Sequence, residues 1–219
     1  MARLVSGLGI NDLDYAVAPV INGKQERCPF YFRWKHMLTR CSDMYKEKDR
    51  GVYADKEVHP EWLRASNFKS WMENQHWQGY DLDKDILVPG NKIYGPDTCV
   101  FIPQWLNKVV ICADKARGKY PLGVSYLTDK NMVNEKSKPF VSTVNIFKEG
   151  KSILEYLGVY STPEDAHKAW QVAKIECLQI SIERYKLEKG YDLRVENSLQ
   201  ARIQKIKLEA AQNLETLSL

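Results

Sequence analysis

The sequence predicts an α+β protein, in which a helical region with a small ββα motif precedes a three-stranded antiparallel sheet, a long helix and a C-terminal helix. Turn signals at Pro89-Gly90-Asn91 and Gly95-Pro96-Asp97 divide the segment Tyr80 to Asn107 into short strands. Apolar and polar residues alternate from Phe140 to Phe147, which indicates a half-buried strand. The pair Thr162-Pro163 is a typical helix start.

The length and composition are those of an ordinary soluble globular protein, with 219 residues, 44% hydrophobic and 27% charged. We expect an N-terminal arm over 1–25, a domain over 26–112, a second domain over 113–190 and a helix over 191–219. No apolar run reaches the roughly 18 residues of a membrane span. Because no signal peptide is recognisable either, a cytoplasmic location is expected.

Charge and cysteine usage narrow the classes of partner. The net charge is +4, and the basic residues gather in two segments: Arg27 to Lys56 holds eight against four acids, and Lys108 to Lys151 holds nine against four. Such segments suit a phosphate backbone, although solvated basic loops explain them equally. The five cysteines include no C-x-x-C pair, so reduced thiols are expected rather than a structural zinc site.

The N-terminal part is expected to be mostly helical. Residues 1–25 have little periodicity and predict an extended arm without a core of its own. Phe30 to Tyr45 has a helical apolar stripe, and Ser66 is a candidate N-cap for the next helix. Tryptophans at 62, 71 and 77 are expected to form a small aromatic core rather than to stack on bases.

The segment Tyr80 to Asn107 carries the strongest chemical signal. It predicts a strand, a loop, a second strand and a helix beginning near Gln104. Asp83, Asp85 and Asn91 then lie on two arms of one small unit. Carboxylate and amide oxygens in that arrangement suit a single divalent ion that activates water for hydrolysis.

These residues resemble the HNH nuclease motif of phage-encoded endonuclease-like proteins, whose pattern reads roughly LD(K/R)D…GN…Y.P..C. The upstream segment Trp34 to Cys41, together with Trp62, Phe68 and Trp71, matches such proteins too. The resemblance covers roughly residues 26 to 190. It implies a cytoplasmic location in an infected bacterial cell.

The HNH resemblance implies a Mg²⁺ or Mn²⁺ site formed by Asp83, Asp85 and Cys99, and catalytic roles for Asp83, Lys84, His76 and Asn91. Two substitutions depart from the family. Lys84 takes the place of the histidine base, and a lysine is protonated at neutral pH. Cys99 replaces a histidine or asparagine ligand, and a thiol suits a hard ion poorly. His76, or the more remote His59, is a candidate substitute base, and ordinary structural roles for both stay open.

The C-terminal half predicts strands over Pro121 to Tyr126, Phe140 to Phe147 and Ile153 to Tyr160, with a hairpin turn at Glu149-Gly150. Thr162 is then the N-cap of a helix that runs to about Lys189. Its inward face is expected to carry six residues: Ala166, Ala169, Trp170, Ala173, Cys177 and Ile180.

Tyr156 to Ala166 resembles the second half of an AP2-type DNA-binding domain, in which the open face of a three-stranded sheet enters the major groove. The matching outward positions are Ser125, Thr143, Asn145 and Tyr156. Arginines and tryptophans, frequent there in the family, are few in this chain, which favours weaker polar contacts or shape reading. Lys138, Lys148 and Lys151 are expected to hold phosphates.

The tail from Val195 to Leu219 predicts one more helix, which either packs back on the protein or pairs with a second chain. Double-stranded DNA is the expected partner. In one interpretation the protein is a metal-dependent endonuclease of the homing type. In the other, the HNH fold is catalytically inactive, and the protein is a DNA-binding regulator or a phage inhibitor of a host defence or nucleic-acid machine. A host protein as the true ligand stays open.

Overall fold

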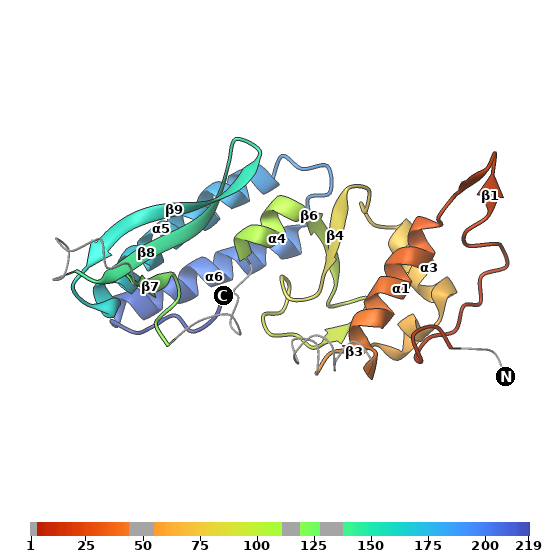
Figure 1. Cartoon of the computed structure of the whole chain (residues 1–219), viewed down its shortest axis with the longest axis horizontal. Coiled ribbons are helices and arrows are strands. Elements are labelled where there is room, and N and C mark those ends of the chain that lie inside the picture. The colour runs from red at the N-terminus through yellow and green to blue at the C-terminus, as the bar shows by residue number, and fades with distance from the viewer. Residues whose placement is uncertain (1–3, 44–54, 111–118, 128–137) are drawn as a thin grey trace. The chain divides into compact units, whose positions relative to one another are not determined.

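The computed structural model describes residues 4–43, 55–110, 119–127 and 138–219, and it confirms the α+β class (Figure 1). The chain divides into two compact units, Met1–Ile102 and Pro103–Leu219. The boundary expected near Ala113 lies outside the described residues. Among those described, none of the helices combines the length and the apolar content that a membrane crossing requires.

The first unit is organised around an aromatic core, as the tryptophans predicted. Helix α1 (Pro29–Cys41) buries Trp34, Met37, Leu38 and Cys41, which belong to the predicted apolar stripe; its last predicted residue, Tyr45, lies outside the described residues. A 3₁₀ turn η1 (Pro60–Leu63) and helix α3 (Ala65–Glu73) supply the other side. The ring centroid of Trp62 lies 5.0 Å from that of Phe68 and 4.6 Å from that of Trp71, so these side chains fill the core.

The N-terminal arm packs against this core: Val5 and Leu13 are partly buried on it. The amide of Ile10 donates to the carbonyl of Leu63 (2.7 Å), and the carbonyl of Ile10 accepts from Ala65 (3.1 Å). Gly9 lies so close to α1 that a Cβ there would stand 2.5 Å from Leu38 Cδ1. Beyond this contact, β1 (Val20–Ile21) and β2 (Lys24–Gln25) form a short hairpin.

Asp12, in the same arm, caps helix α3 from 54 positions away in the sequence. Its Oδ1 accepts from the Ser66 backbone N–H (2.9 Å), and its Oδ2 accepts from the Ser66 hydroxyl (2.6 Å) and from Arg64 Nε (3.0 Å). The prediction that Ser66 is the N-cap is therefore wrong. Helix α3 begins at Ala65, and a distant carboxylate satisfies the free N–H group in its first turn.

Short strands complete the first unit. β3 (Glu57–Val58) pairs in parallel with β5 (Ile93–Tyr94). β4 (Tyr80–Asp83) pairs with β6 (Val100–Pro103), so the two arms of the central segment do form strands. Helix α4 (Gln104–Val110), the first helix of the second unit, begins where the sequence predicted.

The second unit contains an antiparallel sheet in the order β7–β8–β9, formed by Val124–Tyr126, Phe140–Lys148 and Lys151–Tyr160. The hairpin turn at Glu149-Gly150 is confirmed, with φ of +52° and +79°. Pairing is regular from the turn to Thr143, which faces Tyr156, and then shifts by one residue, so that Ser142 faces Gly158. Leu157 is therefore the extra residue of a β-bulge.

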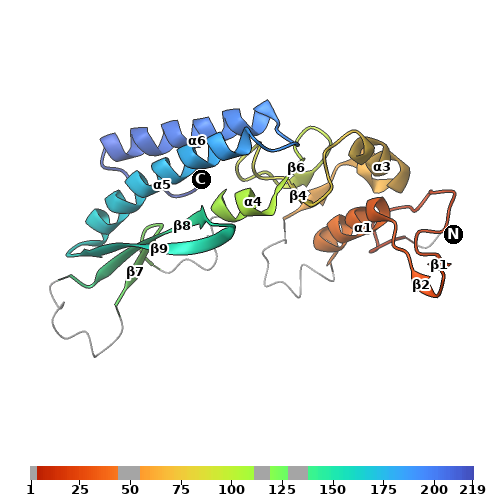
Figure 2. The ribbon, with the colours of Figure 1, turned by 90° about the horizontal axis from the view of Figure 1, so that it is seen from above.

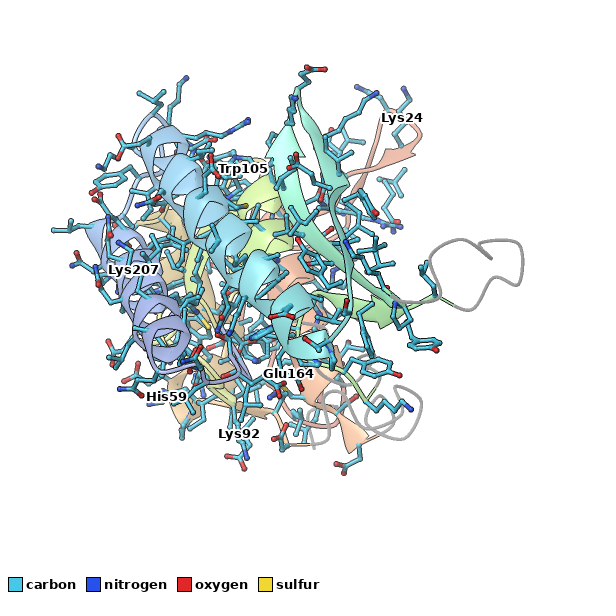
Figure 3. All side chains as sticks on the ribbon, turned by 90° about the vertical axis from the view of Figure 1, so that its left-hand side faces the viewer. Lys24, His59, Lys92, Trp105, Glu164 and Lys207 are labelled. Carbon is cyan, nitrogen blue, oxygen red and sulfur yellow. The ribbon has the colours of Figure 1, made fainter. Side chains whose placement is uncertain are left out.

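Helix α5 (Pro163–Tyr185) lies between the sheet and helix α6 (Leu193–Ala211), as Figures 2 and 3 both show. The Thr162 hydroxyl accepts from the Asp165 N–H (3.1 Å), which confirms the predicted N-cap. The tail helix packs back on α5, as one of the two alternatives held. The predicted inward face is wrong at Ile180, whose side chain is exposed, and the helix ends at Tyr185, short of Lys189.

A buried polar cluster fixes the last residues of the chain onto α5. His167 Nε2 accepts from the Thr216 N–H (2.9 Å), so its Nδ1 carries the proton that is donated to the carbonyl of Leu122 (2.9 Å). The Thr216 hydroxyl accepts from Gln171 Nε2 (3.1 Å) and donates to Glu209 (2.7 Å). The tail and the loop before β7 are thus both held by one helix.

Replacing Asp12 by alanine is expected to lower the free energy of unfolding by about 1–2 kcal/mol, because the first turn of α3 loses its cap. Burial alone would raise the pKa of Asp12, but the hydrogen bonds from Ser66 and the charge of Arg64 outweigh it and lower the pKa below 3.8. The contribution of the ionised Asp12 carboxylate to the free energy of unfolding is therefore present at neutral pH and lost as the pH falls through that lowered pKa. Urea unfolding of Asp12→Ala beside Asp14→Ala, an exposed control, measures it; equal stability of the two would contradict this role.

Candidate functional site

The central loop is a self-contained hydrogen-bonded structure built on Asp83. The Asp83 Oδ1 accepts from the backbone N–H groups of Asp85 (2.8 Å) and Ile86 (2.6 Å), which makes an Asx turn directly after β4. Burial raises the pKa of the Asp83 carboxyl above its ordinary value. Asp83 therefore shapes the loop through one of its two carboxylate oxygens.

Lys84 lies inside this loop, with only 5% of its side chain exposed. Its Nζ donates to both carboxylate oxygens of Asp85 (2.6 Å each) and to the carbonyl of Asn91 (2.9 Å). An ammonium group has three donors, and all three are used. The second expected metal ligand, Asp85, is thus paired with a lysine of the same loop.

Asn91 closes the loop from the other side. Its Nδ2 donates to the carbonyls of Lys84 (2.9 Å) and Ile93 (2.7 Å), and its Oδ1 accepts from the Ile93 N–H (3.1 Å). Both polar atoms of the amide are therefore engaged with the backbone. This geometry gives Asn91 a role in shaping the loop.

The other residues expected in the site, Cys99, His76 and His59, have other surroundings. The Cys99 side chain is fully buried, and burial raises the pKa of its thiol to about 12, so the thiol stays protonated at neutral pH. His76 packs its ring against Tyr80, with centroids 4.9 Å apart. His59 Nδ1 accepts from the Glu61 N–H (3.4 Å) at the start of η1.

A divalent ion does not fit the arrangement of these side chains. Asp83 is committed to the Asx turn, Asp85 to Lys84, and Cys99 is a buried thiol rather than a thiolate. In the described ranges, no three or more His, Cys, Asp or Glu residues are grouped so that they could hold a metal ion. The implied site of Asp83, Asp85 and Cys99 is thus not formed by this geometry.

A different surface has the expected character of a nucleic-acid interface: the open face of the β7–β8–β9 sheet. Ser142 and Val144 are buried, so they mark the face covered by α5. Thr143 and Asn145 alternate with them and point to the other side. Register pairing places Tyr156 opposite Thr143, and Ser125 opposite Val141, on that same open face. The four expected base-facing residues therefore lie together.

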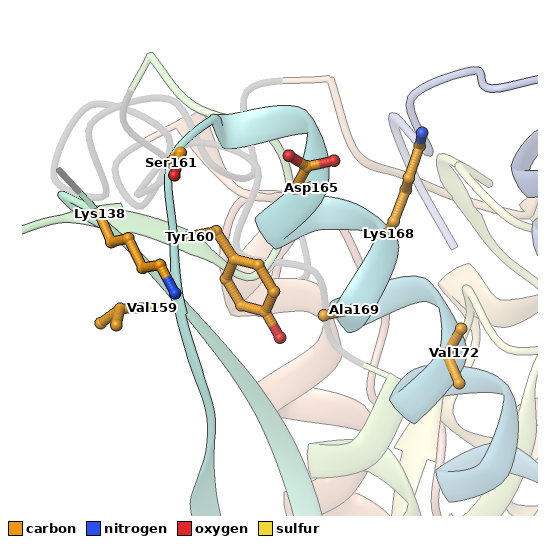
Figure 4. A pocket seen from close by; sticks show the side chains of 8 residues that line it. All are labelled: Lys138, Val159, Tyr160, Ser161, Asp165, Lys168, Ala169 and Val172. Carbon is orange, nitrogen blue, oxygen red and sulfur yellow. The ribbon is translucent and has the colours of Figure 1, made fainter.

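The three expected phosphate-binding lysines are exposed at two places on this sheet. Lys148 and Lys151 are directly opposite each other in the strand register, at the tip of the β8–β9 hairpin. Lys138 lies before β8, at the rim of a shallow pocket that Val159 and Tyr160 also line (Figure 4). Figure 4 also shows that Lys168 extends from α5 away from this strand. Lys148 and Lys151 therefore stand at the hairpin tip, where alternation along the strands puts them on the side of Val144. Lys138 lies near the other end of β9, in a pocket that α5 residues also line.

The predicted set of base-facing residues omits apolar side chains of this face, among them Leu154, which is 64% exposed. It lies directly opposite Asn145. The signal was present, because a two-residue turn at Glu149-Gly150 fixes the register of every pair up to Thr143 and Tyr156. An apolar side chain in the middle of the polar face was therefore predictable from the turn alone.

Substitutions of Asp83 test whether it is a structural residue. Asp83→Asn keeps an oxygen acceptor for both amides and removes a charge that burial disfavours, so we expect its stability at pH 7 to equal or exceed the wild type. Asp83→Ala leaves two amides without their partner and is expected to cost about 1–3 kcal/mol. Urea unfolding at pH 7 compares the three proteins.

The pH dependence of the same comparison has a definite sign. A raised pKa means that the folded protein favours the protonated Asp83 carboxyl over the charged one. The contribution of this carboxyl to the free energy of unfolding is therefore full below about pH 3.8, its ordinary pKa, and is lost as the pH rises through the raised pKa. The stability of Asp83→Asn relative to the wild type should therefore increase between pH 4 and pH 7. A decrease over that range would show that the charged carboxylate is stabilised by the fold.

Comparison of the chain with protein-family models, curated proteins and solved structures found no match. The HNH and AP2 resemblances therefore stay expectations from the sequence.

Proposed function

We propose that the protein binds double-stranded DNA through the open face of the β7–β8–β9 sheet. The observation that carries the proposal is the convergence of four polar side chains on one face of a sheet whose other face is covered by α5. These side chains are Ser125, Thr143, Asn145 and Tyr156.

The dimensions and the charge of this face support the proposal. The B-DNA major groove is about 12 Å wide and admits a β-ribbon. The β8–β9 hairpin is such a ribbon, nine and ten residues long, and it projects Lys148 and Lys151 at its tip. Lysines at the tip suit phosphates at the groove edge, while the polar residues between the strand ends suit base edges. Glu155 faces Val144 across the strands and lies on the side opposite the open face; by the same register Lys148 and Lys151 start on that side too and reach phosphates only from the free tip beside the turn.

The proposal takes the central loop as a scaffold rather than a nuclease centre. What supports this is the lysine at the position of the expected base, buried and bonded to Asp85 and Asn91. A base must accept a proton, and a metal ligand must have a free oxygen. The inactive HNH-like DNA-binding regulator is thus the better supported of the two interpretations. If the ligand is a host protein instead of DNA, the fold is the same but the protein should not bind a duplex. Measurement of duplex binding therefore distinguishes a DNA ligand from a protein ligand.

Salt-dependent binding of a duplex by the full-length chain tests the function. Because phosphate contacts release counterions, the logarithm of the affinity should fall linearly with the logarithm of the salt concentration. Lys148→Ala and Lys151→Ala should each reduce that slope by about 1. Lys207→Ala is the matched control, because Lys207 lies on α6, on the far side of α5 from the sheet (Figure 3). Fluorescence anisotropy from 50 to 300 mM salt, on the order of physiological strength, measures these slopes.

Two results would contradict this function. One is an absence of any duplex affinity at low salt in a folded protein. The other is an equal loss of slope in Lys207→Ala and in the hairpin variants, because the basic charge would then act without regard to its position.

Cleavage is tested separately on supercoiled plasmid with Mg²⁺ or Mn²⁺. We expect no metal-dependent nicking by the wild type, since Lys84 occupies the centre of the loop. Nicking that Asp83→Ala abolishes and Lys207→Ala retains would show a working site in the central loop and would restore the endonuclease interpretation.

A further inference from the structure

The open face carries an amide and an apolar side chain directly opposite each other, and from this pair we infer a preference for A·T base pairs read in the major groove. The inference rests on the proposed DNA binding and adds the class of sequence that is bound. The two side chains are those of Asn145 on β8 and Leu154 on β9, which are paired in register.

Asn145 is positioned to use its amide on an external group. Its carbonyl accepts from the Cys177 Sγ–H (3.4 Å), which fixes the backbone of β8 on α5. Its side chain is exposed, and within the described part of the chain no hydrogen bond is made by its amide. One amide presents a donor and an acceptor side by side, and this is the pattern that matches N7 and N6 of adenine in the major groove.

Leu154 supplies the complementary apolar contact. Its side chain is 64% exposed, and that of Tyr156, two residues along the same strand, is 61% exposed. Directly opposite residues of an antiparallel pair hold their Cβ atoms roughly 5 Å apart. Thymine places its C5-methyl group in the same groove as adenine N6 and N7, whereas a G·C pair has no methyl group there. The adjacent amide and leucine thus match both halves of one A·T pair.

The strands of this sheet lack the side chain that most often reads guanine, and the guanidinium of Arg184, from α5, lies over the ring of Phe147 near the hairpin end (4.2 Å to the centroid). Strands β7, β8 and β9 contain no arginine, and the lysines Lys148 and Lys151 stand at the ends of their strands, beside the turn. Bidentate contacts to guanine O6 and N7 come mainly from arginine or lysine. Lysines at the tip are placed for phosphates, so the middle of the face is left to Asn145, Leu154 and their neighbours.

Base analogues in one duplex test this inference with the full-length protein. An A·T-rich duplex should bind roughly 5- to 150-fold more tightly than a G·C-rich duplex of equal length, the range of one good bidentate contact. Replacing adenine by 7-deazaadenine removes N7, and replacing thymine by uracil removes the methyl group. Each replacement should weaken binding several-fold, because both changes lie in the major groove and leave the minor groove unchanged.

Variants assign each effect to its residue. Asn145→Ala should lose the response to 7-deazaadenine and keep the response to uracil, and Leu154→Ala should do the reverse. Leu187→Ala is the matched control, because Leu187 is 86% exposed and lies beyond α5. It should respond to both analogues as the wild type does. All three side chains are exposed, so the variants are expected to fold.

The failures of the inference and of the proposed function give different results. Salt-dependent binding with equal affinity for A·T-rich and G·C-rich duplexes would overturn the inference and leave the DNA-binding function intact. A preference for A·T-rich duplexes that stays unchanged when 7-deazaadenine and uracil are substituted would also overturn the inference, and would indicate minor-groove or shape reading. No duplex affinity at all would overturn the DNA-binding function itself and point to a protein partner for the exposed Leu154 and Tyr156.

Discussion

The second unit depends on one constraint: helix α5 is covered on two sides, by the sheet and by α6. A helix in that position buries polar side chains, and each must find a partner. His167 bonds the carbonyl of Leu122, Gln171 that of Leu214, and Lys174 that of Val109. The loop before β7, the C-terminal tail and helix α4 are each tied to α5 in this way, so one helix organises the whole unit.

The packing of α5 also determines which face of the sheet is exposed to a ligand. Gly123 lies against α5 so closely that a Cβ there would stand 2.0 Å from the Trp170 ring. With Ser142 and Val144 packed toward the same helix, one face of the sheet is committed to the core. The opposite face keeps Ser125, Asn145 and Tyr156 exposed and Thr143 half-buried, on a support fixed by α5. Preorganised side chains on strands lose less entropy on binding than side chains on loops, which favours this face as the recognition surface.

The local features of the fold were predictable from the sequence, and the long-range ones were not. The Thr162 cap, the Glu149-Gly150 turn and the α1 stripe depend on residues within a few positions of one another, so their signals are in the sequence. The cap of α3 comes from Asp12, and no local pattern indicates a partner 54 residues away. The inward face of α5 was misjudged at Ile180 because two-sided burial removes the single apolar stripe on which the prediction depends.

The central loop shows why site residues were harder to predict than the elements that carry them. The sequence placed Asp83, Asp85 and Asn91 on two arms of one small unit. In the structure Asp83 is the last residue of β4, and Lys84, Asp85 and Asn91 lie in the loop that follows it. Their roles follow from the position of one ammonium group, which bonds two carboxylate oxygens and one carbonyl oxygen. Carboxylate and carbonyl oxygens are the ligands that a divalent ion would also take. A buried cation needs such partners to offset its loss of hydration, and we interpret Lys84 as a covalently attached cation that does for this loop what a bound metal ion would do, without the open coordination positions that catalysis requires.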